Sequence, residues 1–156
     1  MKRYPAIAVI LLATAMAYAS TDPFVGRWVL NPRLSKYPSG TCPKRMVIEM
    51  ERAGDGVHYR SETTYANGVT AHSEYTADYN GKRSLVVGNR GMLLPVALKR
   101  SHSNVVLASY TKGLQVVATS RRVVSKDGGR MTITTISKDR AGTNVTTVGV
   151  YEKQRE

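Results

Sequence analysis

The chain has a single cysteine, Cys42, and this scarcity limits what the fold can be. One cysteine cannot form an internal disulfide, so a disulfide-stapled exported scaffold is excluded. Its neighbours in Gly40-Thr41-Cys42-Pro43 are typical of a turn. The sequence also lacks a Cys-x-x-Cys pair, a Gly-x-Ser-x-Gly elbow and a glycine-rich phosphate loop. We therefore predict no catalytic residues, no metal and no cofactor, and we favour a non-enzymatic protein.

Long hydrophobic runs are also missing. The one apolar run, residues 6–17, is shorter than the roughly 20 residues that span a bilayer. It follows Lys2 and Arg3 and ends in Ala17-Tyr18-Ala19, which is typical of a cleaved signal peptide. Ser20 is not cysteine, so the bacterial lipid-anchor pattern is absent. We predict a signal peptide over residues 1–19, a single domain over residues 20–156 without a membrane span, and a periplasmic or secreted location.

Negative charge is scarce relative to positive charge. The chain carries 23 Lys and Arg against 11 Asp and Glu, a formal net charge of +12. Such a balance favours acidic partners, and anionic envelope polymers are one candidate. The charges are scattered, however, and no run of five or six like charges marks a binding tail, so solubility alone also explains them. The tyrosines are dispersed along expected strands, which is typical of core packing, and nucleic-acid binding is not favoured.

Helical periodicity is absent, and β-forming residues take its place. Val, Thr and Tyr are abundant, and no window sustains a period of 3.6 residues. Ten strands are predicted between Gly-, Asn- and Asp-rich turns: residues 25–31, 44–51, 57–65, 69–79, 83–87, 93–101, 104–112, 114–125, 131–137 and 144–153. Residues 34–37 could add one helical turn in the first connection.

The connections between these strands are mostly two to five residues long. Short turns make each strand the antiparallel neighbour of the one before it, and a long meander tends to close because closure removes unpaired edges. We predict an all-β, antiparallel up-and-down β-barrel of about 8–10 strands. A β-sandwich is the alternative, although it needs longer connections between its sheets.

Residues 24–28, Phe-Val-Gly-Arg-Trp, resemble the Gly-x-Trp motif at the first strand of lipocalin-like barrels. The mature chain is also similar to small exported bacterial β-barrel proteins, mostly without an assigned activity. The stretches that carry the similarity are residues 26–32, 35–37, 74–82, 120–128 and 150–153. The resemblance implies a barrel with a cavity and names no ligand. It also implies a late basic side chain that covers Trp28, with Lys153 and Arg155 as the candidates.

Asn67-Gly68 is a strong hairpin signal, and its register decides which side chains face inward. If the two residues form a type I′ turn, His72 lies opposite Thr63 and shares a face with Tyr59 and Glu74. That face is then the interior, and His72, Glu74 and Tyr59 line a cavity. His58 lies on the other face, so it cannot share a metal with His72. An outward polar face is the competing interpretation.

Arg121 and Arg122 are adjacent in a predicted strand, so one of them must face inward. A buried arginine is costly unless it meets an anion, such as a carboxylate or phosphate head group, or a glutamate of the protein. The sequence leaves open which of the two it is. We predict binding of a small amphipathic molecule, with an anionic head group as one option, at Trp28, Tyr59, His72, Glu74, Arg121 and Arg122. The alternative is a filled barrel whose positive exterior interacts with the cell envelope.

Overall fold

The structure is a computed structural model that describes residues 21–155, and the predicted signal peptide lies outside these residues. Eleven strands form one antiparallel sheet. The first six are β1 (Gly26–Leu30), β2 (Arg45–Ala53), β3 (Gly56–Thr64), β4 (Thr70–Asp78), β5 (Asn80–Ser84) and β6 (Val87–Gly88). The other five are β7 (Val96–His102), β8 (Val105–Lys112), β9 (Gln115–Val124), β10 (Arg130–Lys138) and β11 (Asn144–Lys153). Residues 21–155 contain no helix, and hence none that could cross a membrane.

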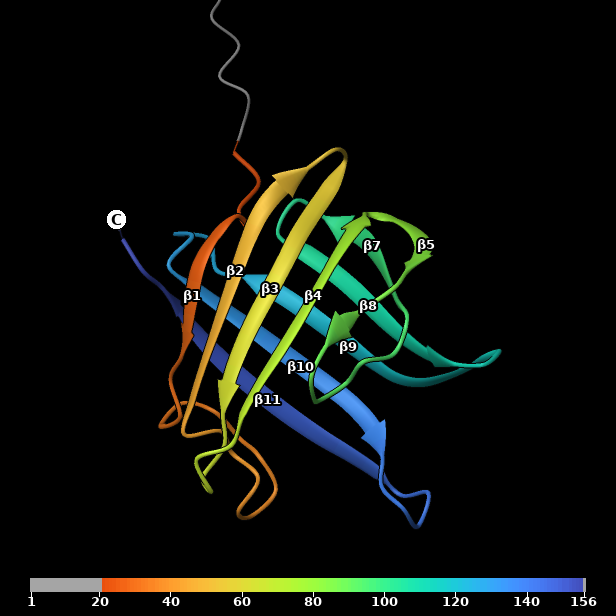
Figure 1. Cartoon of the computed structure of the whole chain (residues 1–156). Coiled ribbons are helices and arrows are strands. Elements are labelled where there is room, and N and C mark those ends of the chain that lie inside the picture. The colour runs from red at the N-terminus through yellow and green to blue at the C-terminus, as the bar shows by residue number, and fades with distance from the viewer. Residues whose placement is uncertain (1–20, 156) are drawn as a thin grey trace, which may run out of the picture.

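The sheet curls so that its two halves face each other. The strand order is β5-β7-β8-β9-β10-β11-β1-β2-β3-β4-β6, so the last strand, β11, pairs with the first. In Figure 1, β1–β4 lie across β7–β11 with the interior between them. The all-β, up-and-down architecture is therefore confirmed, and a two-sheet sandwich is not formed.

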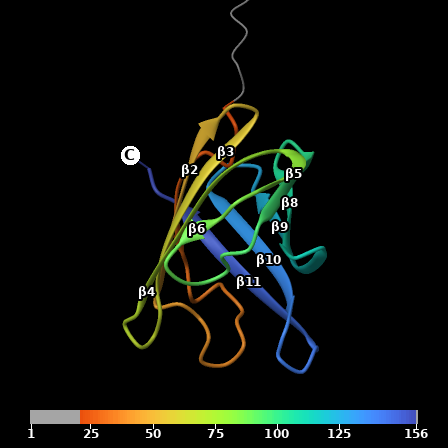
Figure 2. The same ribbon diagram turned by 45° about the vertical axis from the view of Figure 1, so that its right-hand side comes forward.

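The ladder of strands does not close completely, which differs from the predicted meander. β5 pairs with β7 and β6 pairs with β4, so these two strands are the edges of the sheet. The chain between them crosses the gap, as Figure 2 shows. The predicted strand over residues 83–87 is divided between β5 and the two-residue β6, and the pairing of β5 with β7 is irregular between Asn80 and Arg83. The result is a half-barrel in which the two edge strands, β5 and β6, do not pair with each other.

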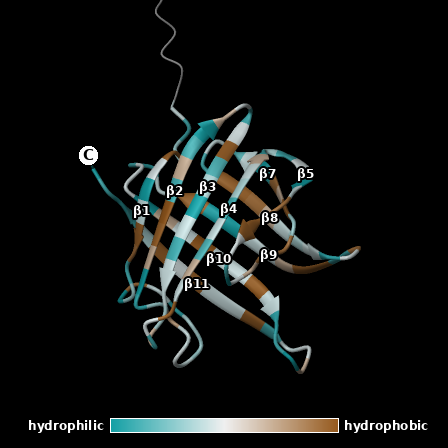
Figure 3. Ribbon diagram, viewed as in Figure 1, coloured by the Kyte–Doolittle hydropathy of each residue, from teal (hydrophilic) through white to brown (hydrophobic). Residues whose placement is uncertain are grey.

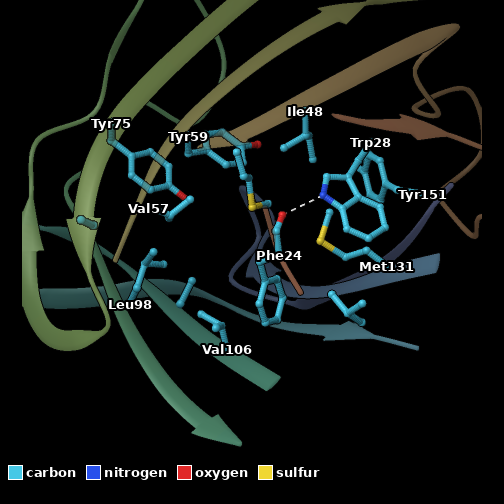
Figure 4. Packing of buried hydrophobic residues seen from close by; sticks show 14 of the residues in the cluster. Phe24, Trp28, Ile48, Val57, Tyr59, Tyr75, Leu98, Val106, Met131 and Tyr151 are labelled. Carbon is cyan, nitrogen blue, oxygen red and sulfur yellow. Dashed lines mark hydrogen bonds between the residues drawn. The ribbon is translucent and has the colours of Figure 1, made fainter. Parts of the chain in front are cut away.

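The Gly-x-Trp motif packs the end of the barrel at which β1 begins and β11 ends. Trp28 is completely buried, and its indole N–H donates to the carbonyl of Phe24 at 2.9 Å (Figure 4). The Lys153 ammonium lies 5.0 Å from the centroid of the indole ring, so the basic side chain expected from the resemblance is present. A Cβ at Gly26, whose φ is +137°, would clash with the Lys153 side chain, and this explains the glycine.

A packed apolar core surrounds Trp28. It includes Ile48, Met50, Val57 and Leu98, all nearly inaccessible to solvent. Hydrophobic and hydrophilic residues alternate along these strands (Figure 3). Because successive side chains point to opposite faces, one face of each strand supplies the core and the other carries most of the charged residues. This half of the interior is therefore filled by the protein itself.

Candidate functional site

The turn at Asn67-Gly68 determines which side chains reach the interior. The Tyr65 N–H donates to the carbonyl of Val69 at 2.9 Å, and the Gly68 N–H donates to the carbonyl of Tyr65 at 2.9 Å. Gly68 has a φ of +82°, and no residue other than glycine has a positive φ among those described. A type I′ turn would require a positive φ at Asn67 as well, so the loop is a three-residue turn closed by a left-handed glycine.

This turn shifts the pairing of β3 and β4 by one residue relative to the predicted register. His72 lies opposite Glu62, not Thr63, and His58 lies opposite Thr76. Because side chains alternate between faces, a one-residue shift moves every side chain of β4 to the other side. The prediction that His72 and Glu74 face the interior is therefore wrong.

His72 and Glu74 instead lie on the outer face of the half-barrel and are exposed to solvent. Glu74 Oε1 lies 3.4 Å from Nε2 of His58, and Nδ1 of His58 lies 2.8 Å from the Thr76 hydroxyl. His72 borders the cavity through its place in β4, but its side chain is on the outer face. His58 and His72 thus share a face, contrary to prediction, yet residues 21–155 hold no cluster of three His, Cys, Asp or Glu that could bind a metal.

The interior side chains of β3 and β4 are a different set. Tyr59 and Ser61 from β3 face Tyr75 and Ser73 from β4. The rings of Tyr59 and Tyr75 stack with centroids 4.6 Å apart, and the hydroxyls of Ser61 and Ser73 lie 2.8 Å apart. Tyr59 was a predicted site residue, whereas Tyr75 was placed on the opposite face by the incorrect register.

Of the two arginines in β9, Arg122 is the one that points inward. Arg122 is only 3% exposed, whereas Arg121 is exposed on the outer face. The register follows from the β9–β10 connection, in which Ser125 pairs with Arg130 and residues 126–129 form the loop. The structure thus settles a choice that the sequence left open.

Arg122 lies among aromatic side chains instead of acidic ones. Its guanidinium carbon is 5.3 Å from the ring centroid of Tyr59 and 6.0 Å from that of Tyr75. Its Nη2 donates to the Tyr110 hydroxyl at 3.2 Å. Its Nε has no hydrogen-bond partner within the described structure, and neither does the hydroxyl of Tyr75 or that of Ser120.

Tyr59 and Tyr75 cannot neutralise the charge of Arg122. Burial raises the pKa of Tyr59 to about 12, although the nearby Arg122 acts in the opposite direction. Burial likewise raises the pKa of Tyr75. Both phenols are therefore neutral at physiological pH, and within residues 21–155 Arg122 forms no ion pair. A buried charge of this kind is unfavourable by several kcal/mol unless another group compensates it.

A cavity of about 280 Å³ opens beside Arg122. Its inner wall includes Tyr59, Tyr75, Tyr110 and Arg122, and no Asp or Glu lies among the residues that line it. Ile48, Met46 and Ile133 add apolar surface, while Met92 and Arg90 lie at the mouth. The arrangement combines an apolar wall with one buried cation and neutral hydroxyls, which suits an amphipathic anion.

Several predicted site residues lie elsewhere. Trp28 is in the packed core and does not line the cavity, and Glu74 and Arg121 are outside it. Sequence reasoning missed Tyr75 and Tyr110. The available signal for Tyr75 was the alternation along β4, where small or apolar residues alternate with polar ones: Ala71, Ser73, Tyr75 and Ala77.

Comparisons with known proteins show the fold only. No family model and no curated protein matches the chain. Among solved structures, the chain is similar to the ileal bile acid-binding protein of zebrafish in complex with cholic acid, with a TM-score of 0.53 and 14% sequence identity. The match covers 85% of this chain and 99% of that chain. The chain thus shares its fold, an antiparallel up-and-down half-barrel, with this structure.

Proposed function

We propose that this protein is a non-enzymatic carrier that binds a small, amphipathic, anionic molecule inside the half-barrel. The acidic head group contacts Arg122, and the apolar part rests on Ile48, Met46 and Ile133. We also propose that the protein is exported, to the periplasm or outside the cell, because a signal peptide is predicted at its N-terminal end. The similarity to a structure that holds cholic acid, an amphipathic acid, supports this choice of ligand class.

The observation that carries the proposal is the buried charge of Arg122 at the wall of a cavity without acidic residues. A carboxylate or sulfonate in the cavity could accept hydrogen bonds from the guanidinium, whose Nε is free within the described structure, and from the Tyr75 hydroxyl. The same ion pair would compensate the charge that the protein leaves unpaired. The cavity, about 280 Å³, is close to the lower end of the roughly 300–1,000 Å³ typical of ligand pockets. A small molecule is therefore the expected ligand.

The alternative of a completely filled barrel is less well supported. The packed core occupies one end of the interior, but the cavity remains open at the other end. The volume is too large to be a packing defect, since defects larger than a water molecule are few in protein interiors.

The proposal is tested by titrating the purified protein with a fluorescent naphthalene sulfonate and displacing the probe with cholate or a medium-chain fatty acid. Arg122→Gln is expected to weaken binding about tenfold or more, because a charge-assisted hydrogen bond contributes roughly 1.5–3 kcal/mol.

Arg121→Gln is the matched control, because it makes the same change in net charge one residue away on the outer face. It should leave probe binding unchanged. Equal affinities for the wild type and Arg122→Gln, or no saturable binding by the wild type, would refute an anion site at Arg122.

A further inference from the structure

The acidic residues are distributed unevenly along the chain. Residues 79–126 contain nine Lys and Arg residues and no Asp or Glu, and all 11 acidic residues lie outside this range. The range covers β5 to β9, which are neighbours at one side of the sheet apart from the two-residue β6. The charged side chains of β5 to β9 are therefore all basic, and the carboxylate that pairs with Arg100 of β7 comes from Asp22.

The opposite side carries paired charges. Ion pairs cross the outer face of β1–β3: Arg27–Glu49, Arg45–Glu62 and Arg60–Glu51. In contrast, within residues 21–155 no carboxylate lies within ion-pair distance of Lys99, Lys112 or Arg121. The unpaired cations leave a positive surface that attracts an anionic partner.

Apolar side chains lie between these cations. Lys99, Leu107 and Arg121 are direct cross-strand partners on β7, β8 and β9, so Leu107 sits between two positive side chains. A shallow depression of about 660 Å³ includes these three residues and Ile136 of β10. Leu107 and Ile136 are both exposed to solvent. We call this surface, together with the β8–β9 turn, the basic face.

The β8–β9 turn at the edge of the basic face exposes apolar side chains. Leu114 is 90% exposed and Val116 is 57% exposed. Lys112 precedes them, and the Arg83 guanidinium donates to the carbonyl of Gly113 at 3.4 Å. Figure 1 shows this hairpin extending away from the body of the half-barrel, and Figure 3 shows hydrophobic residues near its tip. An apolar tip beside two cations is typical of a segment that enters a lipid interface.

β8, which leads into this hairpin, also contributes Tyr110 to the wall of the cavity. The Thr111 N–H at the end of β8 donates to the carbonyl of Pro95, which follows the cavity-mouth residues Arg90 and Met92.

We propose that the basic face docks on an anionic lipid bilayer, with Leu114 and Val116 inserted among the lipids and the cations on the phosphate groups. A bilayer fits better than a soluble polyanion, because only a partner with an apolar interior removes Leu114 and Val116 from water. This inference concerns the outer surface and holds whether or not the cavity binds a ligand.

The test is co-sedimentation of the purified protein with vesicles of equal parts phosphatidylglycerol and phosphatidylcholine, and with pure phosphatidylcholine vesicles. The protein should bind the anionic vesicles and bind pure phosphatidylcholine only weakly. Lys112→Gln with Arg121→Gln should weaken binding to anionic vesicles about tenfold or more, because each basic side chain near the surface contributes roughly a factor of five. Leu114→Gln with Val116→Thr should also weaken it about tenfold.

The matched control is Arg27→Gln with Arg45→Gln, which removes the same charge from the ion-paired side. The control should retain most of the affinity for anionic vesicles. Equal loss from both charge variants would indicate net charge alone and overturn the proposal. The proposal would also be overturned if the protein bound dextran sulfate as tightly as anionic vesicles and Leu114→Gln with Val116→Thr weakened neither interaction. Probe binding in solution is measured separately, so failure here is distinguishable from failure of the cavity site.

Discussion

Replacing Arg122 with methionine should stabilise the protein while removing its anion site. The side chain is almost fully buried and forms no ion pair within residues 21–155, so its charge is unfavourable in the ligand-free protein. Met is unbranched and flexible, so it can fill much of the same space without a charge. The change loses the charge-assisted hydrogen bond to Tyr110, worth roughly 1.5–3 kcal/mol, and the contacts with the Tyr59 and Tyr75 rings.

Removal of the desolvation penalty should exceed these losses. Substitution of buried ionic groups by apolar ones is often stabilising by about 1–4 kcal/mol, and we expect about 1–3 kcal/mol for Arg122→Met. For a domain of this size, that corresponds to a rise in Tm of roughly 3–10 °C. The measurement is urea unfolding and thermal melting by circular dichroism, without added ligand.

Arg121→Met is the control, because that side chain is exposed and its removal should change stability by no more than about 0.5 kcal/mol. An anionic ligand at 100 times Kd should remove most or all of the difference in Tm, since it stabilises the wild type by about 2.7 kcal/mol but not the Met variant. A clear loss of stability in Arg122→Met would show that the guanidinium holds the tyrosine cluster together, and the argument from an uncompensated charge would fail.

Three further predictions concern the pH dependence, the core and the outer face. Because burial raises the pKa of Tyr59 to about 12 from 10.0, the folded state keeps a proton that the unfolded state loses as the pH rises. Tyr59 alone should lower the free energy of unfolding by up to about 3 kcal/mol between pH 10 and 12, and the raised pKa of Tyr75 should add to this loss, as urea unfolding at alkaline pH would show. Trp28→Phe should destabilise the protein by about 2–3 kcal/mol in urea unfolding, because it leaves the buried Phe24 carbonyl without its donor and creates a small cavity. His72→Ala with Glu74→Ala should leave sulfonate-probe affinity unchanged in a titration, and a large loss would mean that these outer residues reach the ligand.

The charge of the candidate anion site should not change with pH near neutrality. Arginine stays protonated at any pH at which the protein is folded, and the raised pKa values of Tyr59 and Tyr75 keep both phenols neutral. The charge that the ligand meets is therefore constant between mildly acidic and mildly alkaline pH.

The sequence determined the class of fold because its signals are local. The period-two alternation in β2, with Met46, Ile48 and Met50 on one face, requires only neighbouring residues to be recognised. The resemblance carried by the Gly-x-Trp motif likewise implied a late basic side chain over Trp28, and Lys153 fills that role. The prediction that Trp28 itself binds the ligand was wrong, because its side chain is packed in the core. Local alternation and short turns were enough to predict an antiparallel, up-and-down sheet.

The tertiary structure decided which face of each strand is inside. Asn67-Gly68 is compatible with a two-residue or a three-residue turn, and the two differ by one residue in register, which exchanges the faces of β4. For that reason the sequence placed His72 and Glu74 in the cavity, where Tyr75 lies instead. The inward direction of Arg122 depends similarly on the β9–β10 connection and on packing against the distant Tyr59. Composition and alternation set the architecture, whereas the register of long-range pairing, which no local pattern encodes, selected the residues of the site.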